Sequence, residues 1–238
     1  YEEMHLSKTA EHTRAYIKVQ DGCNQFCTYC IIPYARGRMR SRDKESVLNQ
    51  AQSLVNHGFS EIVLTGIHTA GYGQDFDDYS FYDLLADLTT KVIGLKRLRI
   101  SSIEMSQVSE DIINLIAESK IIVDHLHIPI QSGCDTTLKR MNRHYTIKEF
   151  TDKLTILKTK LPSLSITTDV IVGFPQESEE EFESTYRWIK KLHFNQLHVF
   201  PYSKRKGTPA ARMKDQVDEK VKKQRVKELL DLSHTLMR

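Results

Sequence analysis

Cys23, Cys27 and Cys30 are three of the four cysteines in this 238-residue chain, and they form a Cys-x3-Cys-x2-Cys run. A run this tight on a short loop can turn three thiolates toward one centre. Three thiolates ligate three irons of a [4Fe-4S] cluster and leave the fourth iron without a protein ligand. Because chemistry at a protein-bound metal takes place at an open coordination position, the spacing predicts a reactive cluster.

Two other interpretations of these cysteines are weaker. A structural zinc site usually has four Cys or His ligands, and the sequence offers no second Cys-x2-Cys pair. Zinc nevertheless remains the main alternative. Disulfides are disfavoured because three cysteines so close together cannot all pair, and no secretory signal is recognisable. Clustered thiols instead predict a reducing, cytoplasmic location.

The cysteine run also resembles the signature of radical S-adenosylmethionine (SAM) enzymes, with the aromatic Tyr29 directly before the last cysteine. The resemblance implies that the amino and carboxylate groups of SAM chelate the open iron. It also implies that the reduced cluster, supplied with an electron by a donor such as a flavodoxin-type reductant, cleaves SAM to a 5′-deoxyadenosyl radical. Tyr29 either leans against the adenine of SAM or only packs beneath the cluster.

Composition is that of a globular, mildly basic domain. The net charge is +3, with 39% hydrophobic and 27% charged residues, which permits an RNA partner without demonstrating one. No apolar run has the length of a membrane span, so no membrane association is expected. The first residue is Tyr1 and the last lies in a charged helical pattern, so we expect a domain of a longer protein. We divide it into a linker (1–14), a catalytic domain (15–213) and a C-terminal helix (214–238).

The elements that must position the cysteines alternate regularly between strand and helix patterns. Strand-like runs occupy 15–20, 61–66, 97–102, the surroundings of His125–Ile128, 164–172 and 196–201. Helical patterns occupy 43–57, 80–91, 109–119, 137–141, 146–161, 178–192 and the residues from Asp215 onward. Such alternation requires parallel strands with right-handed crossovers. Six units fall short of a closed eight-unit barrel, so we predict an α/β fold, a partial (β/α)6 TIM-like barrel of the radical SAM type.

Chemistry in such barrels sits on loops at the carboxyl ends of strands, and several candidates lie there. Gly66 lets a ligand approach the backbone, although it is also an ordinary turn glycine. Ser102 and Glu104 are placed to hold the ribose and the ammonium group of SAM, or to cap a helix. Gln131 is predicted to contact SAM. His125 and His127 are interpreted as barrel-lining residues.

The fifth strand and the segment before it supply two further candidates. Asp169 stands in an otherwise apolar strand, where a carboxylate is costly to bury, so it either pairs or takes part in SAM binding. Gly173 and Pro175 shape a turn able to carry the adenine edge. Arg143 is a candidate fork for the carboxylate of SAM, although surface arginines are common.

Basic residues follow the cysteine run at alternate positions: Arg36, Arg38, Arg40 and Arg42. Together with the segment Lys204, Arg205 and Lys206, they predict a strip that contacts an RNA backbone. A solvated loop with local salt bridges is the alternative. The basic residues of the C-terminal helix are expected to form an exposed face.

Longer segments resemble the methylthiotransferase branch of the radical SAM superfamily. The matching segments are 22–37, 64–73, 127–133, 139–143, 168–175 and 201–210. Leu64-Thr-Gly-Ile-His68 followed by Tyr72-Gly73 is similar to the subgroup that converts N6-threonylcarbamoyladenosine of tRNA, next to the anticodon, to its 2-methylthio form. The alternatives are the subgroups that act on isopentenyladenosine in tRNA or on a ribosomal protein.

The resemblance also implies parts that this sequence lacks. Full-length members carry an N-terminal domain with a second, auxiliary cluster and a C-terminal RNA-binding domain. Cys134 alone cannot hold that second cluster; it replaces a usual serine, and Gln176 replaces a usual glycine. We therefore predict that this chain alone binds one cluster and cleaves SAM without completing methylthiolation. The competing hypothesis is a non-catalytic metal module that binds RNA.

Overall fold

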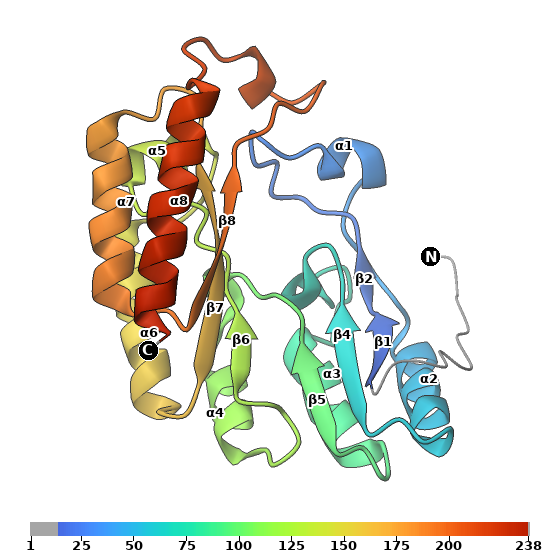
Figure 1. Cartoon of the computed structure of the whole chain (residues 1–238). Coiled ribbons are helices and arrows are strands. Elements are labelled where there is room, and N and C mark those ends of the chain that lie inside the picture. The colour runs from blue at the N-terminus through green and yellow to red at the C-terminus, as the bar shows by residue number, and fades with distance from the viewer. Residues whose placement is uncertain (1–13, 238) are drawn as a thin grey trace. The chain divides into compact units, whose positions relative to one another are not determined.

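The computed structural model describes residues 14–237, and Figure 1 shows the course of the chain. The predicted linker lies outside the described residues except for Arg14, which begins the first strand. The described chain divides into two compact units, which we treat separately. The first contains the described residues up to Asn24, Arg36–Leu126 and Leu157–Leu164; the second contains Gln25–Ala35, His127–Ile156 and the residues from Ser165 onward.

The first unit is built on a parallel sheet. Its strands are β1 (Arg14–Lys18), β4 (Glu61–Thr65) and β5 (Arg97–Ile100), in that order. Its helices are α2 (Lys44–Asn56), α3 (Phe81–Lys91) and α4 (Glu110–Glu118); α2 contacts β1 and α3, and α3 contacts α4. Strand residues Ile17, Ile62 and Leu98 are fully buried, as are Leu84 and Leu85 of α3. Burial of this apolar surface holds the helices on the sheet. Short 3-10 turns η1 (Thr69–Gly71) and η2 (Met105–Gln107) follow β4 and β5.

The second unit repeats the arrangement. Its sheet has the order β6-β7-β8, formed by His125–His127, of which His127 belongs to this unit, by Ser165–Val172 and by Gln196–Pro201; β7 and β8 pair in parallel. Its helices are α5 (Asp135–Arg140), α6 (Ile147–Lys160), α7 (Glu179–Leu192) and α8 (Glu219–Leu236). Figure 1 shows α7 and α8 side by side, and α8 also contacts β7 and β8. Both units therefore confirm the predicted alternation of parallel strands and helices.

Local sequence explains where several helices begin. The Asp43 side chain accepts a hydrogen bond from the backbone N–H of Ser46 at the start of α2. Ser80 and Ser178 each form a full capping box with the acidic residue three positions later. These caps satisfy backbone donors that have no partner within the helix. They place the N-termini of α2, α3 and α7 where the sequence predicts them.

Three details differ from the sequence-based expectation. The short helix α1 (Ile32–Arg36) and the antiparallel pair β2 (Gln20–Asp21) and β3 (Arg40–Ser41) were not predicted, because segments this short carry no periodicity. The last helix begins at Glu219 rather than Asp215, because Asp218 caps it and Asp215 adopts a left-handed backbone with φ of 54°. The basic face expected on this helix is partly wrong, since Lys222 and Arg225 are each only 4% exposed.

No helix in the described part of the chain is long and apolar enough to cross a membrane.

Candidate active site

The segment around Cys27 is held by the loop that follows α5. Thr28 donates from its backbone N–H to the carbonyl of Met141 (3.0 Å) and from Oγ1 to the carbonyl of Arg140 (2.8 Å). The Asn142 side-chain amide donates to the carbonyl of Phe26 at 3.1 Å. Phe26 and Asn142 both have left-handed backbones, with φ of 49° and 57°. A backbone kept in this sparsely populated region needs surrounding contacts to hold it, and these hydrogen bonds supply them.

Arg143 lies against the thiol of Cys27 in this loop. Its Nη1 is 3.5 Å from the Cys27 Sγ, which is buried, and its guanidinium stacks over the Tyr145 ring at 5.2 Å. The thiolate is the form of cysteine that ligates metals. Burial raises the pKa of Cys30, so assembly of a metal centre at these cysteines is expected to release protons. The donor set and its cationic neighbour fit a thiolate-ligated iron cluster.

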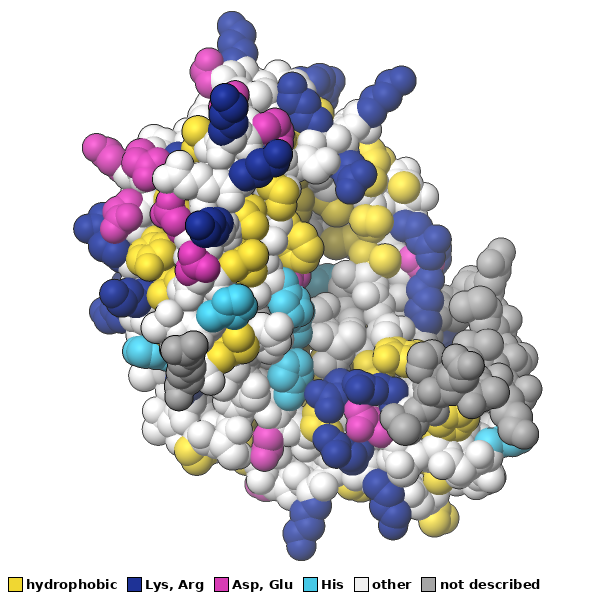
Figure 2. Space-filling model, in the orientation of Figure 1, with side chains coloured by type: hydrophobic (Ala, Val, Ile, Leu, Met, Phe, Trp, Pro, Cys, Tyr) yellow, Lys and Arg dark blue, Asp and Glu magenta, His cyan; other side chains and the backbone are white. Residues whose placement is uncertain are grey.

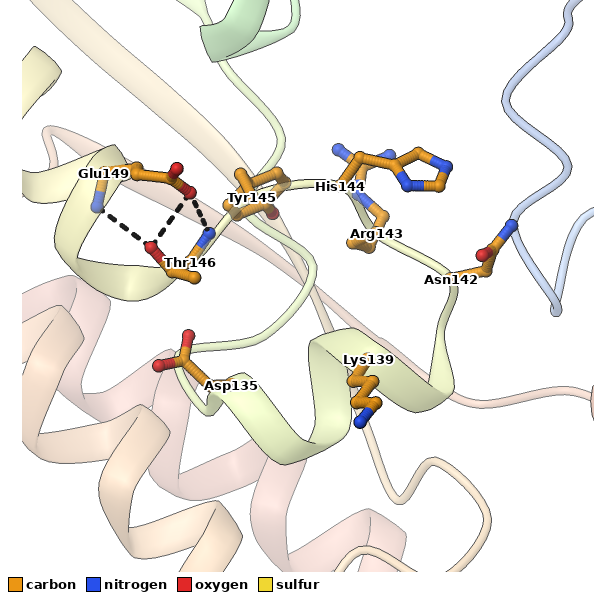
Figure 3. Close-up of a pocket in the computed structure, with 8 residues that line it drawn as sticks. All are labelled: Asp135, Lys139, Asn142, Arg143, His144, Tyr145, Thr146 and Glu149. Carbon is orange, nitrogen blue, oxygen red and sulfur yellow. Dashed lines mark hydrogen bonds between the residues drawn. The ribbon is translucent and has the colours of Figure 1, made fainter.

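A pocket of about 490 Å³ opens beside the same loop, and Arg143 is part of its wall (Figure 3). Its lining is polar and carries both signs of charge: Asp135, Lys139, Asn142, Arg143, His144, Tyr145, Thr146 and Glu149. Glu149 accepts hydrogen bonds from the backbone N–H and the hydroxyl of Thr146, at 2.8 and 2.9 Å, as Figure 3 shows. Arg143, which is predicted to bind the carboxylate of SAM, is therefore accessible from a pocket and also lies next to Cys27.

Tyr29 packs into a small apolar cluster of the second unit. Its ring meets Phe174 edge to face, with ring centroids 6.4 Å apart. The other members of the cluster are Met141, Tyr202 and Ala210, all buried. The packing role weighed for Tyr29 is thus present in the structure, and its contact with adenine stays a prediction.

The strand-end residues of the first unit gather around Gln20. A Cβ on Gly66 would lie 3.0 Å from Gln20 Oε1 and 3.2 Å from its Cβ, so the glycine is needed for this close approach. The same Oε1 accepts the backbone N–H of His68 at 2.8 Å. Ser101 Oγ lies 3.2 Å from Thr69 Oγ1, which connects the ends of β5 and β4. Ser102 and Glu104 follow directly, and Glu104 precedes η2 as its N-cap residue.

Gln131, the candidate after β6, has a strained backbone. Its φ is 64°, a value uncommon for residues other than glycine. Its N–H donates to the carbonyl of Asp169 and its own carbonyl accepts from Ile171, each at 2.9 Å. These bonds extend the parallel pairing with β7 and hold Gln131 in place. Strain of this kind clusters at functional sites, which agrees with the prediction without testing it.

Asp169 pairs with two histidines. Its Oδ2 lies 3.1 Å from His127 Nε2, and its Oδ1 lies 3.3 Å from His198 Nδ1. Of the two possibilities left open for this carboxylate, pairing is what the structure shows. Sequence reasoning missed His198, which stands opposite Asp169 in the β7–β8 register. Pairing the two predicted strands in this register would have indicated His198, because side chains at paired positions of neighbouring parallel strands point to the same face of the sheet.

Some residues of the predicted basic strip have ion-pair or hydrogen-bond partners close to them in the structure. Arg36 and Arg40 bind Asp21 at 2.9 and 3.2 Å. Arg42 does not belong to a surface strip: it is 3% exposed and donates to Gln50 and to Ser46. The remaining basic candidates, all exposed, are Arg38, Lys204, Arg205 and Lys206. Figure 2 shows Lys and Arg side chains scattered over the visible face rather than gathered in one patch.

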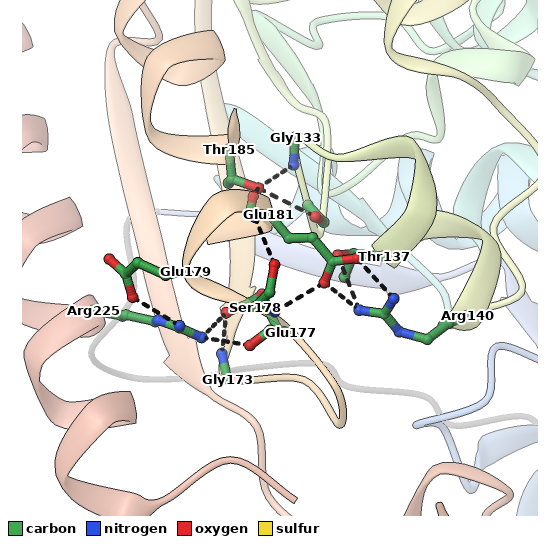
Figure 4. A network of polar contacts seen from close by, with 11 residues as sticks. Gly133, Thr137, Arg140, Gly173, Glu177, Ser178, Glu179, Glu181, Thr185 and Arg225 are labelled. Atoms are coloured by element: carbon green, nitrogen blue, oxygen red, sulfur yellow. Dashed lines mark hydrogen bonds and ion pairs between the residues drawn. The ribbon is translucent and has the colours of Figure 1, made fainter. Parts of the chain in front are cut away.

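An ionic network centred on the buried pair Arg225 and Glu177 supports the second unit (Figure 4). Arg225 donates to Glu177 at 2.8 Å and to Glu179 at 3.0 Å. Glu177 Oε1 also accepts the backbone N–H of Gly173 at 2.8 Å. Burial raises the pKa of Glu177 to about 7, against the lowering effect of the Gly173 N–H and of Arg225. The network fixes the turn after β7 to α8.

A second group in Figure 4 connects α7 to the loop that holds Thr28. Arg140 donates through Nη1 to Glu181 at 2.8 Å, and the Gly133 N–H donates to Thr185 Oγ1 at 3.0 Å. Because Arg140 also accepts from Thr28 through its carbonyl, α7 helps to position the cysteine segment. Sequence reasoning did not single out these residues, since each pair joins positions far apart in the chain.

Comparison with known proteins agrees with this geometry. A relative from Bacillus subtilis, named threonylcarbamoyladenosine tRNA methylthiotransferase MtaB, is 60% identical over 99% of this chain and 52% of its own length. A tRNA-2-methylthio-N(6)-dimethylallyladenosine synthase from Carboxydothermus hydrogenoformans is 44% identical over 93% of this chain and 50% of its own length. The chain thus spans about half the length of the curated relatives it matches.

Solved structures and a family model also match this chain. The radical SAM methyltransferase TsrM from Kitasatospora setae superposes with a TM-score of 0.67 at 18% identity, over 83% of this chain and 38% of that one. Methylornithine synthase (PylB) gives 0.62 at 16% identity, over 92% and 62%. These likenesses confirm the expected α/β fold of the radical SAM type. The family model "Radical SAM superfamily" matches residues 17–189. The chain therefore belongs to the radical SAM superfamily, whose enzymes use a [4Fe-4S] cluster and SAM.

Proposed function

We propose that this chain is the radical SAM domain of a tRNA methylthiotransferase that acts on N6-threonylcarbamoyladenosine. The observation that carries the proposal is the 60% identity, over 99% of the chain, to the threonylcarbamoyladenosine tRNA methylthiotransferase of Bacillus subtilis. A dimethylallyladenosine substrate is the second candidate, supported by the 44% identity to the synthase from Carboxydothermus hydrogenoformans. The higher identity and the Leu64-Thr-Gly-Ile-His68 segment favour the first.

The proposed roles follow the positions described above. Cys23, Cys27 and Cys30 ligate the cluster. The pocket residue Arg143 lies next to the Cys27 sulfur and is accessible to the carboxylate of SAM. The bound cluster and SAM together supply the radical that removes a hydrogen from the adenine.

The other SAM contacts are proposed at strand ends. Gly66 offers backbone that a ligand can approach, and Ser102 and Glu104 offer a hydroxyl and a carboxylate. Gln131 is held rigidly enough by its two backbone bonds to orient a ligand. Asp169 stays a predicted SAM contact; its two carboxylate oxygens face the imidazoles of His127 and His198.

We propose Arg38, Lys204 and Arg205 as phosphate contacts, because they are exposed and no ion pair to a described residue neutralises them. Arg36 and Arg40 should contribute less, since Asp21 compensates part of their charge. In this proposal the radical domain covers 15–213, and the C-terminal segment 214–238, which contains α8, leads toward an RNA-binding domain. An auxiliary-cluster domain and a flavodoxin-type electron donor complete the enzyme.

A chimera tests the proposal. This chain replaces the matching segment of the Bacillus subtilis relative in a strain that lacks its own gene, and tRNA nucleosides are analysed by mass spectrometry. The proposal expects the 2-methylthio form of threonylcarbamoyladenosine to return, and to be absent with Cys27→Ala. A 2-methylthio form of dimethylallyladenosine alone would favour the second candidate. A chimera that is stable and iron-loaded but yields neither product would reject both candidate substrates.

A further inference from the structure

We propose that His127, Asp169 and His198 form a binding site for one divalent transition-metal cation, using none of the cluster cysteines. Each residue offers one ligand atom, and these atoms all lie within 4.8 Å of one another. The three residues belong to β6, β7 and β8 of one unit, so ordinary strand pairing brings them together. No segment has to move to assemble the site.

The spacing of the ligand atoms suits a single ion. His127 Nε2 and His198 Nδ1 lie 3.1 and 3.3 Å from the two oxygens of Asp169. Ligands with bonds of about 2.0–2.2 Å to a common metal are about 2.8–3.5 Å apart when they are neighbours in a tetrahedral or octahedral shell. Both distances fall within this range. The three ligand atoms as a set lie within 4.8 Å of one another, so a small rotation of the side chains brings them to bonding distance of one ion.

A further contact orients His127 for this role. Its Nδ1 lies 2.9 Å from Thr167 Oγ1, and Thr167 stands on the same face of β7 as Asp169. With Nδ1–H donating to that hydroxyl, the lone pair of Nε2 points to the metal position. Histidine ligands commonly have such a partner for their other ring nitrogen. His198 stacks on His127 with ring centroids 5.4 Å apart, which limits the freedom of both rings.

The chemistry of the three ligands selects the class of ion. Two imidazoles and one carboxylate suit Zn²⁺ or Fe²⁺ and leave at least one position open for water or another oxygen ligand. Along β7, positions 166, 168, 170 and 172 are buried, whereas the positions between them, including Asp169, are partly exposed. The side chain of His198 is 44% exposed. An ion and its water can therefore reach the site.

The test measures Zn²⁺ binding to the full chain in two forms. The first is the anaerobically cluster-loaded protein, whose iron content is followed to show that zinc has not displaced the cluster. The second carries Cys23→Ala, Cys27→Ala, Cys30→Ala and Cys134→Ala, all four cysteines, which removes the competing thiolates; circular dichroism checks its folding. After desalting, calorimetry gives the affinity and elemental analysis gives zinc per chain. The expected result is one zinc per chain in the cluster-loaded form and in the folded form with all four cysteines replaced.

Single substitutions then locate the ion. His198→Ala and Asp169→Asn are expected to weaken binding by more than about 100-fold, since loss of even an outer partner costs about 10–100-fold. Thr167→Val keeps the shape but removes the hydroxyl, and should weaken binding by about 10–100-fold. His234→Ala, on the exposed side of α8, is the matched control and should change nothing. Absence of zinc binding in the cluster-loaded protein, or binding that survives His198→Ala and Asp169→Asn, would overturn the proposal.

Discussion

Asp21, directly before the glycine and first cysteine of the cluster motif, forms ion pairs with three cationic side chains of the first unit. It is 6% exposed and lies 2.8 Å from Lys18 Nζ, 2.9 Å from Arg36 Nη2 and 3.2 Å from Arg40 Nη2. Burial alone would raise its pKa, but hydrogen bonds from Lys18, Arg36 and the Gly22 N–H lower it from 3.8 to about 2. The stabilisation this represents is present above pH 3.8 and is lost as the pH falls through about 2.

The lowered pKa sets the size of the effect of Asp21→Asn. At about 1.4 kcal/mol for each pKa unit, the carboxylate contributes at most about 2.5 kcal/mol at neutral pH. The three cationic side chains are 30%, 46% and 44% exposed, so solvent screening reduces this, and we expect a loss of about 1–2 kcal/mol. Part of the loss should disappear at high salt, because ions screen exposed charges.

Urea unfolding at pH 7, at low and at high salt, measures this loss directly. Asp152→Asn is the control, because Asp152 pairs with Lys148 on an exposed helix surface and such pairs contribute little. A difference for Asp21→Asn below about 0.5 kcal/mol, the usual range of neutral surface changes, would refute the reasoning. So would a loss that does not depend on salt.

Three further predictions concern the second unit. Glu177→Gln should remove a pH dependence of the free energy of unfolding. Because the folded protein raises the pKa of Glu177 from 4.5 to about 7, its contribution is fully present below pH 4.5, and up to about 3 kcal/mol is lost as the pH rises toward 7. If urea unfolding gave the same change of stability with pH, from pH 5 to 8, for the variant and the unaltered chain, the prediction would be contradicted. Gly133→Ala places a Cβ 2.8 Å from the Cα of Thr185 and should cost about 1–3 kcal/mol in thermal unfolding; an unchanged melting temperature would show that the site relaxes. Arg143→Lys should keep the iron content that Arg143→Ala loses, because it keeps a cation near Cys27; equal losses would show that charge is not the reason.

The alternating strands and helices could be predicted from the sequence because their signals are local. Apolar periodicity located the helices, and caps such as Ser80 and Ser178 fixed where they begin. The cysteine spacing was likewise a local pattern. The start of the last helix could not be predicted from a local pattern, because the backbone carbonyl of Asp215 accepts a hydrogen bond from the backbone N–H of Gln176, which is distant in the sequence.

The errors concern charged side chains whose partners are remote in the chain. Lys222 and Arg225 follow a pattern typical of a solvated face, yet the carbonyl of Tyr202 and the carboxylate of Glu177 accept their hydrogen bonds in the interior. Arg42 is a different case: its spacing predicted a surface position, but it is buried against the nearby Ser46 and Gln50 of α2. Composition and periodicity carry no information about which acceptor lies across a tertiary contact, and a buried charge is stable only when one does.

The central claim, that these cysteines hold a cluster used to cleave SAM, has a direct measurement. The chain is reconstituted anaerobically with iron and sulfide, reduced and mixed with SAM; iron, sulfide and 5′-deoxyadenosine are then quantified. We predict about four irons per chain, as a cubane requires, and 5′-deoxyadenosine that is lost with Cys27→Ala but retained with Cys134→Ala. Zinc in place of iron, or a complete cluster that cleaves no SAM, would contradict the account.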